Sequence, residues 1–192
     1  MRYIEFNILR QNKHFVAIRE AGGSSVTNDI YVRDSNSQTF WFCGKVARIS
    51  DVSVEQAVAR QYPLIEEHAA RLRPLELYPK RGSLEIWTAP GDSELDVAYN
   101  RPNVQFVKMK RVDQVEGAEN IRNIEIGFQG EIYESGEEGF RTLRTEDGLP
   151  LKPEIEQPKG EKRAPTDEEM AQISELLKDK DINELFKDSN EN

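Results

Sequence analysis

The sequence is poor in the residues that build disulfides and metal sites. Its 192 residues include one cysteine, Cys43, and two histidines, His14 and His68, which stand far apart. A single cysteine cannot form a disulfide within the chain, and no Cys/His spacing matches a zinc site. We therefore expect no metal site, no cofactor and a reducing compartment.

Long apolar runs are missing as well. No stretch approaches the ~20 apolar residues of a membrane-spanning helix, and the N-terminal segment MRYIEFNILRQNK lacks the apolar core of a secretory signal. These absences predict a soluble protein without membrane insertion.

Motifs for catalysis are equally scarce. There is no Gly-x-Ser-x-Gly elbow, and the run at 22–25, GGSS, lacks the spacing of a phosphate-binding loop. Cys43 precedes Gly44 and Lys45 inside a strand-like run, which favours a buried thiol over a nucleophile. In GDSELD, Val97 stands where a calcium loop needs glycine, so its acids indicate a solvent-facing edge. We lean away from an enzyme, although the many acids leave a catalytic carboxylate pair open.

Charge is spread unevenly along the chain. Residues 1–144 hold 19 Lys+Arg and 21 Asp+Glu, a net charge of −2, whereas residues 145–192 hold 7 and 14, a net charge of −7. Four prolines fall within 145–165, which predicts an extended charged linker. We divide the chain into a globular domain (1–144), a Pro-rich linker (145–165) and an acidic amphipathic helical tail (166–192). An acidic arm disfavours nucleic acid and membranes as its partners, because both are polyanions.

The tail carries a short helical pattern. Thr166 and Glu169 have the spacing of a capping box. The apolar positions that follow are candidates for docking, on the body or on a partner, or for a transient helix: Met170, Ile173, Leu177, Leu185 and Phe186.

Most of the body has the pattern of short strands. Residues 2–10 alternate with period two, as in a half-buried strand. Further strands are expected at 15–18, 30–32, 39–46, 84–88, 95–99, 104–109, 121–128, 131–133 and 140–143, with turns that favour antiparallel pairing. The apolar triplet Phe40-Trp41-Phe42 predicts a sheet covered on both faces or a rim site for a partner.

One helix stands out between these strands. Ser53 and Gln56 have the spacing of a capping box. An apolar stripe follows at Val54, Val58, Tyr62, Ile65, Ala69 and Leu72, which Pro63 is expected to kink without ending. The sequence thus predicts an α+β fold: a mainly antiparallel sheet or partly closed small barrel, covered by one long kinked helix at 54–73, with a mobile C-terminal arm.

Two sets of residues are candidates for binding. Trp41 and Trp87, with the covering helix, could enclose an aromatic pocket for a small ligand or an enzyme site. The basic residues Arg71, Arg73, Lys108, Lys110 and Arg111 could contact an anionic protein surface, the acidic tail or single-stranded nucleic acid.

Residues 40–73 and the segment LEIWTAPGDSEL at 84–95 resemble conserved uncharacterised proteins of cyanobacteria and plastids. The resemblance implies a cytosolic or stromal protein and supplies no catalytic residue. Our leading hypothesis is a non-catalytic binding or assembly protein with a protein partner. The alternatives are a small-ligand or enzymatic domain with an aromatic pocket, and a weak binder of single-stranded nucleic acid.

Overall fold

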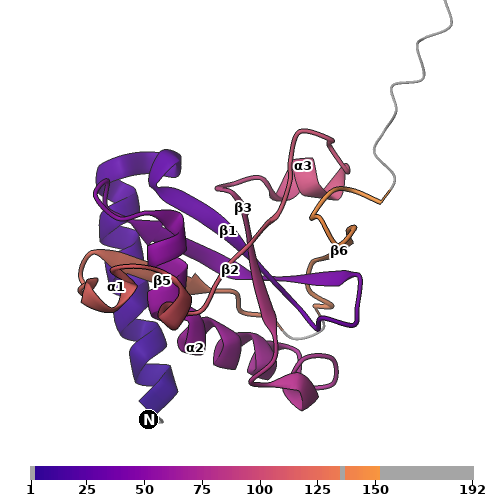
Figure 1. The fold of residues 1–192 in the computed structure, drawn as a ribbon, viewed down its shortest axis with the longest axis horizontal. Helices are drawn as coiled ribbons and strands as arrows, with labels where there is room; N and C mark the ends of the chain where they lie inside the picture. Colours follow the sequence, from indigo (N-terminus) through magenta and orange to yellow (C-terminus); the bar gives the residue numbers. More distant parts are fainter. Residues whose placement is uncertain (1–2, 135–136, 152–192) are drawn as a thin grey trace, which may run out of the picture. The chain divides into compact units, whose positions relative to one another are not determined.

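The computed structural model describes residues 3–134 and 137–151. They form a mixed α+β fold, in which a six-stranded antiparallel sheet carries a long helix against each face (Figure 1). The helices are α1 (Tyr3–Gly22), α2 (Val54–Leu72) and the short α3 (Glu94–Ala98). The strands are β1 (Thr27–Arg33), β2 (Thr39–Arg48), β3 (Glu85–Pro90), β4 (Val107–Lys108), β5 (Ile126–Gly130) and β6 (Arg141–Leu143).

The sheet is open rather than barrel-like, so the predicted alternative of a partly closed barrel is wrong. Its order is β4-β3-β1-β2-β5, and β6 pairs with the first half of β2 while β5 pairs with the second half. The strands predicted at 30–32, 39–46, 84–88 and 140–143 are confirmed within a few residues. The strands predicted at 104–109 and 121–128 are shorter than expected, and 131–133 forms none, because irregular loop and turn residues occupy the rest of those segments.

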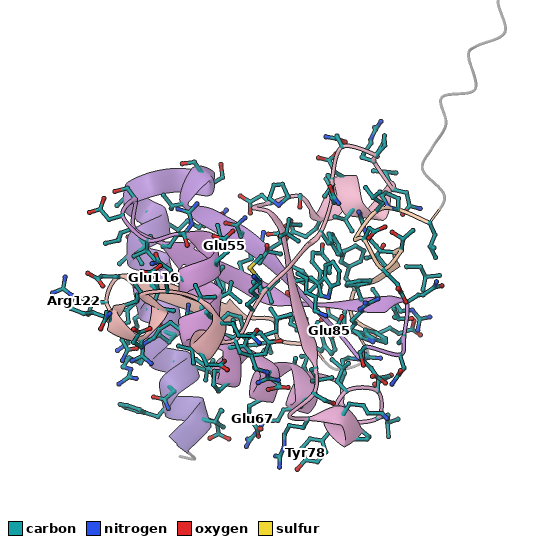
Figure 2. All side chains as sticks on the ribbon, viewed as in Figure 1. Glu55, Glu67, Tyr78, Glu85, Glu116 and Arg122 are labelled. Atoms are coloured by element: carbon teal, nitrogen blue, oxygen red, sulfur yellow. The ribbon has the colours of Figure 1, made fainter. Side chains whose placement is uncertain are left out.

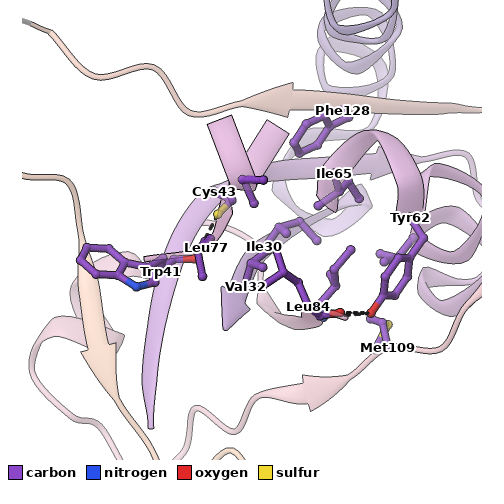
Figure 3. Close-up of a cluster of buried hydrophobic side chains, with 14 of the residues drawn as sticks. Ile30, Val32, Trp41, Cys43, Tyr62, Ile65, Leu77, Leu84, Met109 and Phe128 are labelled. Atoms are coloured by element: carbon purple, nitrogen blue, oxygen red, sulfur yellow. Dashed lines mark hydrogen bonds between the residues drawn. The ribbon is translucent and has the colours of Figure 1, made fainter. Parts of the chain in front are cut away.

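Helix α2 confirms the predicted helix. The Ser53 hydroxyl accepts from the Gln56 amide at 3.1 Å, and the Gln56 side chain accepts from the Ser53 amide at 3.1 Å, so the capping box is complete. The helix continues through Pro63 as one element. Its stripe, including Tyr62 and Ile65, packs on the sheet in the largest apolar cluster (Figure 3). The Tyr62 hydroxyl donates to the Leu84 carbonyl at 2.9 Å, so this buried hydroxyl group has a hydrogen-bond partner inside the apolar cluster.

Helix α1 corrects the strands predicted at 2–10 and 15–18. The alternating apolar residues of that segment do not share a buried face, since Phe6 is 55% exposed. The buried positions are instead Gln11, Phe15 and Ile18, which follow the helical spacing of four and three. Because a glutamine occupies one of them, the apolar pattern alone did not show the helix.

Helix α1 lies against β5 and β2 on the face opposite α2. The contact is made possible by Gly127, because a Cβ there would lie 2.2 Å from the backbone nitrogen of Phe15. A side chain at this position would hold the helix away from the sheet. The alanine that pairs with it on β2, Ala47, is fully buried in the same contact.

The rest of that face is covered by the segment from α3 to β4. Tyr31, Phe40, Phe42 and Trp87 pack there against Val97 and Phe106. The strand predicted at 95–99 is wrong, since helix α3 occupies it and only Val97 of that helix is buried. The alternation of Leu95, Val97 and Tyr99 misled the prediction, because Leu95 and Tyr99 are exposed.

The body extends beyond the predicted boundary at residue 144. Arg144 is fully buried and donates to the carbonyls of Val104 and Gly148, and its guanidinium lies 4.0 Å from the ring centre of Phe106. Burial lowers the pKa of Arg144 to about 10. The Gly148 carbonyl also accepts from the Phe106 amide at 2.9 Å, so residues 145–151 belong to the folded body.

The remaining linker and tail, with their docking candidates at 170–186, lie outside the described residues. Within the part that the structure describes, no helix has an apolar stretch sufficient to cross a bilayer.

Candidate functional site

A bulge in β2 decides which side chains face each side of the sheet. Cys43 and Val46 both point toward α2, so the alternation skips a residue between them, and the pairing with β1 shifts register there. Gly44 has a φ of 134°, and a Cβ on it would lie 2.1 Å from the Gln129 carbonyl oxygen. Glycine is therefore required, and the bulge turns Lys45 to the face opposite α2.

Lys45 lies at the centre of a charged cluster on that face. Its ammonium is 2.6 Å from a carboxylate oxygen of Asp92, 2.6 Å from Glu94 and 3.5 Å from Asp29. Arg19 of α1 adds a pair with Asp92 at 2.9 Å. The cluster fills the seam between the two elements that cover this face, α1 and the segment that starts at α3.

Asp29 is the buried anchor of the cluster. Its carboxylate accepts from the Ser93 amide at 2.8 Å, the Ser93 hydroxyl at 3.1 Å and the Asp92 amide at 3.1 Å, which fixes the turn before α3. Burial raises the pKa of Asp29, and the charge of Glu94 raises it further. The hydrogen bonds from the Ser93 and Asp92 amides act in the opposite direction. Burial acts to lower the pKa of Lys45, but its bonds to Asp92 and Glu94 raise that pKa overall, and Lys45 lowers the pKa of Asp92.

The cluster has the donor set of a cation site. One oxygen from each of Asp29, Asp92 and Glu94 lies within 4.8 Å of the others. Carboxylates at this spacing suit a hard cation. Here the ammonium of Lys45 reaches all three and supplies the positive charge, so the arrangement is a salt-bridged cluster of the protein itself.

A groove runs beside this cluster, and we call it the acidic groove. It consists of two hollows of about 350 and 410 Å³, which adjoin because Phe42, Glu94 and Glu131 line both. The first hollow lies between α1 and the end of β5, and its apolar wall is formed by Ile8, Leu9 and Ile132. The second is lined by aromatic and acidic side chains, which are Phe42, Tyr133, Phe140, Glu94, Glu131, Glu137 and Glu138.

Three carboxylates of the acidic groove belong to no ion pair of the residues that the structure describes. Among the ion pairs of residues 3–134 and 137–151, none includes Glu131, Glu137 or Glu138. Burial raises the pKa of the Glu131 carboxyl, and the charges of Glu137 and Glu94 raise it further. Lys45, the basic residue that lines the groove, is already shared among three carboxylates. The groove is therefore suited to a cation from outside.

The predicted aromatic pocket between Trp41 and Trp87 is wrong. The two side chains lie on opposite faces of the sheet, Trp41 in the cluster under α2 and Trp87 in the cluster under α3. Each is 4% exposed. Trp41 of β2 and Trp87 of β3 stand at strand positions whose side chains point to opposite faces of the sheet. Trp41 does meet Arg73, whose guanidinium lies 3.7 Å from its ring centre, and Arg141 at 5.5 Å.

The predicted basic residues do not form one surface of free charge. Lys110 is exposed and takes part in no ion pair of the described residues, whereas the others are paired with acids. The pairs are Arg71–Glu67 at 2.9 Å, Arg73–Glu76 at 2.7 Å, Arg111–Glu66 at 3.3 Å, and Lys108–Glu85. Arg81 approaches both Glu67 and the Tyr78 hydroxyl at 3.4 Å, and these two partners lie close together in Figure 2.

Cys43 is fully buried, as predicted, and burial raises the pKa of its thiol. Its sulfur lies 3.3 Å from the Trp41 carbonyl oxygen. A thiol held protonated inside the core is a packing group, since the nucleophilic form is the thiolate.

No protein-family model matches this chain. Comparisons with curated proteins and with solved structures found no match either. The resemblance to cyanobacterial and plastid proteins stays a prediction, and function has to be argued from the geometry.

The charged cluster around Lys45 and the acidic groove beside it were not predicted from the sequence. Asp29 lies inside its strand just before the apolar run Ile30–Val32, and Gly44-Lys45 ends the apolar run of the next strand. Both are signs of a polar feature inside a sheet. Their meeting with Glu94 depends on the pairing of β1 with β2 and β3. Such contacts join residues far apart in the chain, which no local pattern shows.

Proposed function

We propose that this protein is a non-catalytic binding protein whose acidic groove takes a basic segment of a protein partner. The observation that carries the proposal is the surplus of carboxylates in the groove. Glu131, Glu137 and Glu138 line the second hollow without a cationic partner among the described residues. A lysine or arginine of a partner supplies the missing charge, and such complementarity governs association rate and specificity.

The walls of the groove favour a peptide over a small cation. Tyr133 and Phe140 are partly exposed and line the same hollow as the acids, where a lysine or arginine side chain gains cation–π attraction. At the other end, Leu9 is 51% and Ile132 77% exposed, which suits an apolar side chain a few residues away. A segment that alternates basic and apolar residues matches both ends.

Nucleic acid and anionic membranes fit this surface poorly. Their phosphates meet carboxylates in the groove, and the basic run at 106–111 offers little in exchange. Phe106 and Met109 of that run are buried, while Lys108 and Arg111 are engaged by Glu85 and Glu66.

The test uses a fluorescein-labelled decapeptide of alternating lysine and leucine, followed by fluorescence anisotropy. We expect it to bind and to weaken as salt is raised, whereas the peptide with glutamate in place of lysine does not bind. The double variant Glu131→Gln/Glu137→Gln should weaken binding by about fivefold or more. Because burial raises the pKa of Glu131, removing its charge should not lower the melting temperature at neutral pH, which separates lost binding from lost folding.

The matched control changes the same charge elsewhere. Glu116, labelled in Figure 2, and Glu119 are exposed on the loop that packs against α2, and neither lines the groove. Glu116→Gln/Glu119→Gln should leave the affinity unchanged, and an equal loss in both variants would overturn the proposal in favour of general charge attraction. Truncation after Leu151 should also leave affinity unchanged. A tighter complex after truncation would mean that the chain's own C-terminal segment, and not a partner, occupies the groove.

A further inference from the structure

A second cavity lies between the two long helices and is independent of the acidic groove. It has a volume of about 320 Å³, within the range of small-molecule sites. Both helices and the loop before β5 contribute, and the lining includes Asn7, Gln11, Arg60, Gln61, Leu64 and Asn123. Polar side chains thus converge at a place where two helices would ordinarily pack through apolar ones.

Two of these side chains are buried with unmet hydrogen-bonding capacity. Gln11 is 3% and Gln61 4% exposed, and the Oε1 atom of each is buried without a donor among the described residues. The Nε2 of Gln61 donates to the Ala57 carbonyl at 3.2 Å and the Gly127 carbonyl at 3.4 Å. These two acceptors fix which end of the Gln61 amide is the oxygen, since the reverse would set oxygen against oxygen.

Pro63 leaves a backbone carbonyl of α2 without its usual helical donor. It lines the cavity from the middle of α2 and has no amide hydrogen. The Ala59 carbonyl, four residues earlier, therefore lacks the donor that a helix ordinarily provides. Buried acceptors without donors are rare in folded proteins, and the two glutamine oxygens at one cavity indicate a molecule that supplies donors.

The rim of the cavity is positive. Arg10 and Arg60 both line it and are exposed, and neither belongs to an ion pair of the residues that the structure describes. Arg60 is held by its bond to the Ile121 carbonyl at 3.1 Å, and Arg10 by its bond to Asn7 at 3.0 Å. The lining contains no carboxylate. Two positioned guanidiniums in a lining without carboxylates suit a carboxylate or phosphate.

We infer that this cavity binds a small organic anion that also carries N–H or O–H donors. The donors reach the Oε1 atoms of Gln11 and Gln61, and the anionic group lies between Arg10 and Arg60. Amino acids and hydroxylated phosphate esters share this chemistry, and the two sources are separated by the probes below.

The experiment measures the melting temperature, and then the affinity by calorimetry, with L-serine and with glycerol 2-phosphate. Each of these two-ended probes carries both an anionic group and N–H or O–H donors. Ethanolamine carries only the donors, and acetate carries only the anionic group. We expect a concentration-dependent rise in melting temperature with at least one two-ended probe and none with the one-ended probes. Whichever two-ended probe binds identifies the anionic group. Equal responses to acetate, or no response to either two-ended probe, would overturn the inference and leave the cavity as a site for water shared by the two glutamines.

Variants test the two ends separately. Arg60→Gln should raise the dissociation constant about tenfold, because it removes a charge-assisted bond. Arg101→Gln, at an exposed arginine outside the cavity, should leave it unchanged. Gln11→Leu removes one buried acceptor, so it should abolish probe binding without lowering the melting temperature. An undiminished response in Gln11→Leu contradicts the assignment of the donors. Because these residues are not shared with the acidic groove, failure here leaves the proposed peptide binding untouched, and the reverse also holds.

Discussion

The two faces of the sheet are covered in different ways. One face lies under a single helix, α2, and its apolar cluster runs without interruption from Trp41 to Phe128. The other face lies under two separate elements, α1 at one end and the segment beginning at α3 at the other (Figure 1). Between them, a buried aspartate and a lysine take the place of apolar residues.

The difference shows where a site can arise on a small sheet. A single amphipathic helix matches the sheet beneath it and excludes water along its whole length. Two covering elements leave a seam, where Asp29 is buried and paired with Lys45, whose side chain stays partly exposed. The acidic groove opens along this seam. The second cavity likewise lies where α1 and α2 meet at the edge of β5.

The largest effect is expected under α2. Ile65 is fully buried there, so Ile65→Ala should lower the free energy of unfolding by about 3–4 kcal/mol through lost burial and a remaining cavity. Leu95→Ala is the control on the other face, because Leu95 is 73% exposed, and it should change stability little. Urea denaturation measures both. A small loss for Ile65→Ala would show that the α2 face is packed more loosely than its burial implies.

A polar substitution in the seam should cost somewhat less. Asp29→Ala leaves two amides and a hydroxyl without their acceptor, which should lower the free energy of unfolding by about 2–3 kcal/mol. Asp29→Asn keeps an acceptor and should recover part of the loss. The same denaturation series checks the order, and equal effects of the two substitutions would contradict the role of Asp29 as an acceptor for the turn at Asp92 and Ser93.

The α2 face could be predicted from sequence because its determinants are local. Ser53 and Gln56 form their cap within one turn, and the stripe from Val58 to Ala69 repeats at helical spacing. Trp41 points to the face opposite Phe40 and Phe42, as the alternation of an extended strand requires, so the aromatic triplet does mark a sheet covered on both faces.

The other face could not be predicted in this way. Helix α1 buries Gln11 and exposes Phe6, so its apolar pattern is misleading. The orientation of Lys45 depends on a bulge at Gly44, which shifts the alternation by one residue. The meeting of Asp29 with Ser93 spans 64 positions and requires the sheet to be formed.

The packing of α1 against the sheet can be tested by adding one side-chain carbon atom at Gly127. Gly127→Ala places a Cβ 2.2 Å from the Phe15 backbone nitrogen, so the helix must shift. We expect a loss of about 1–3 kcal/mol, as for overpacked cores. Native-state hydrogen exchange should show the loss mainly in α1, with α2 retaining its protection. Equal loss in both helices would mean that the two faces unfold as one unit.

The smallest effect concerns pH and the α2 face. His68 of α2 packs edge-on against Phe128, with ring centres 5.6 Å apart, and its Nε2 lies 2.9 Å from the Glu131 carbonyl oxygen. Burial lowers the pKa of His68; its bond to Glu131 opposes this, and the charge of Arg71 adds to the decrease. The unfolded chain therefore takes up a proton at higher pH than the folded chain does.

The sign of the pH effect follows from this difference. Stability is retained above the ordinary histidine pKa of about 6.5 and falls as pH decreases from there toward the folded-state value. His68→Gln should remove this slope between about pH 7 and 5.5, and Arg71→Gln should reduce it, because the folded-state pKa then lies closer to the unfolded one. The melting temperatures of the wild-type protein and of the two variants, measured across this pH range, test the prediction. If His68→Gln keeps the full slope, the acids of the seam, and not the α2 face, control stability in this range.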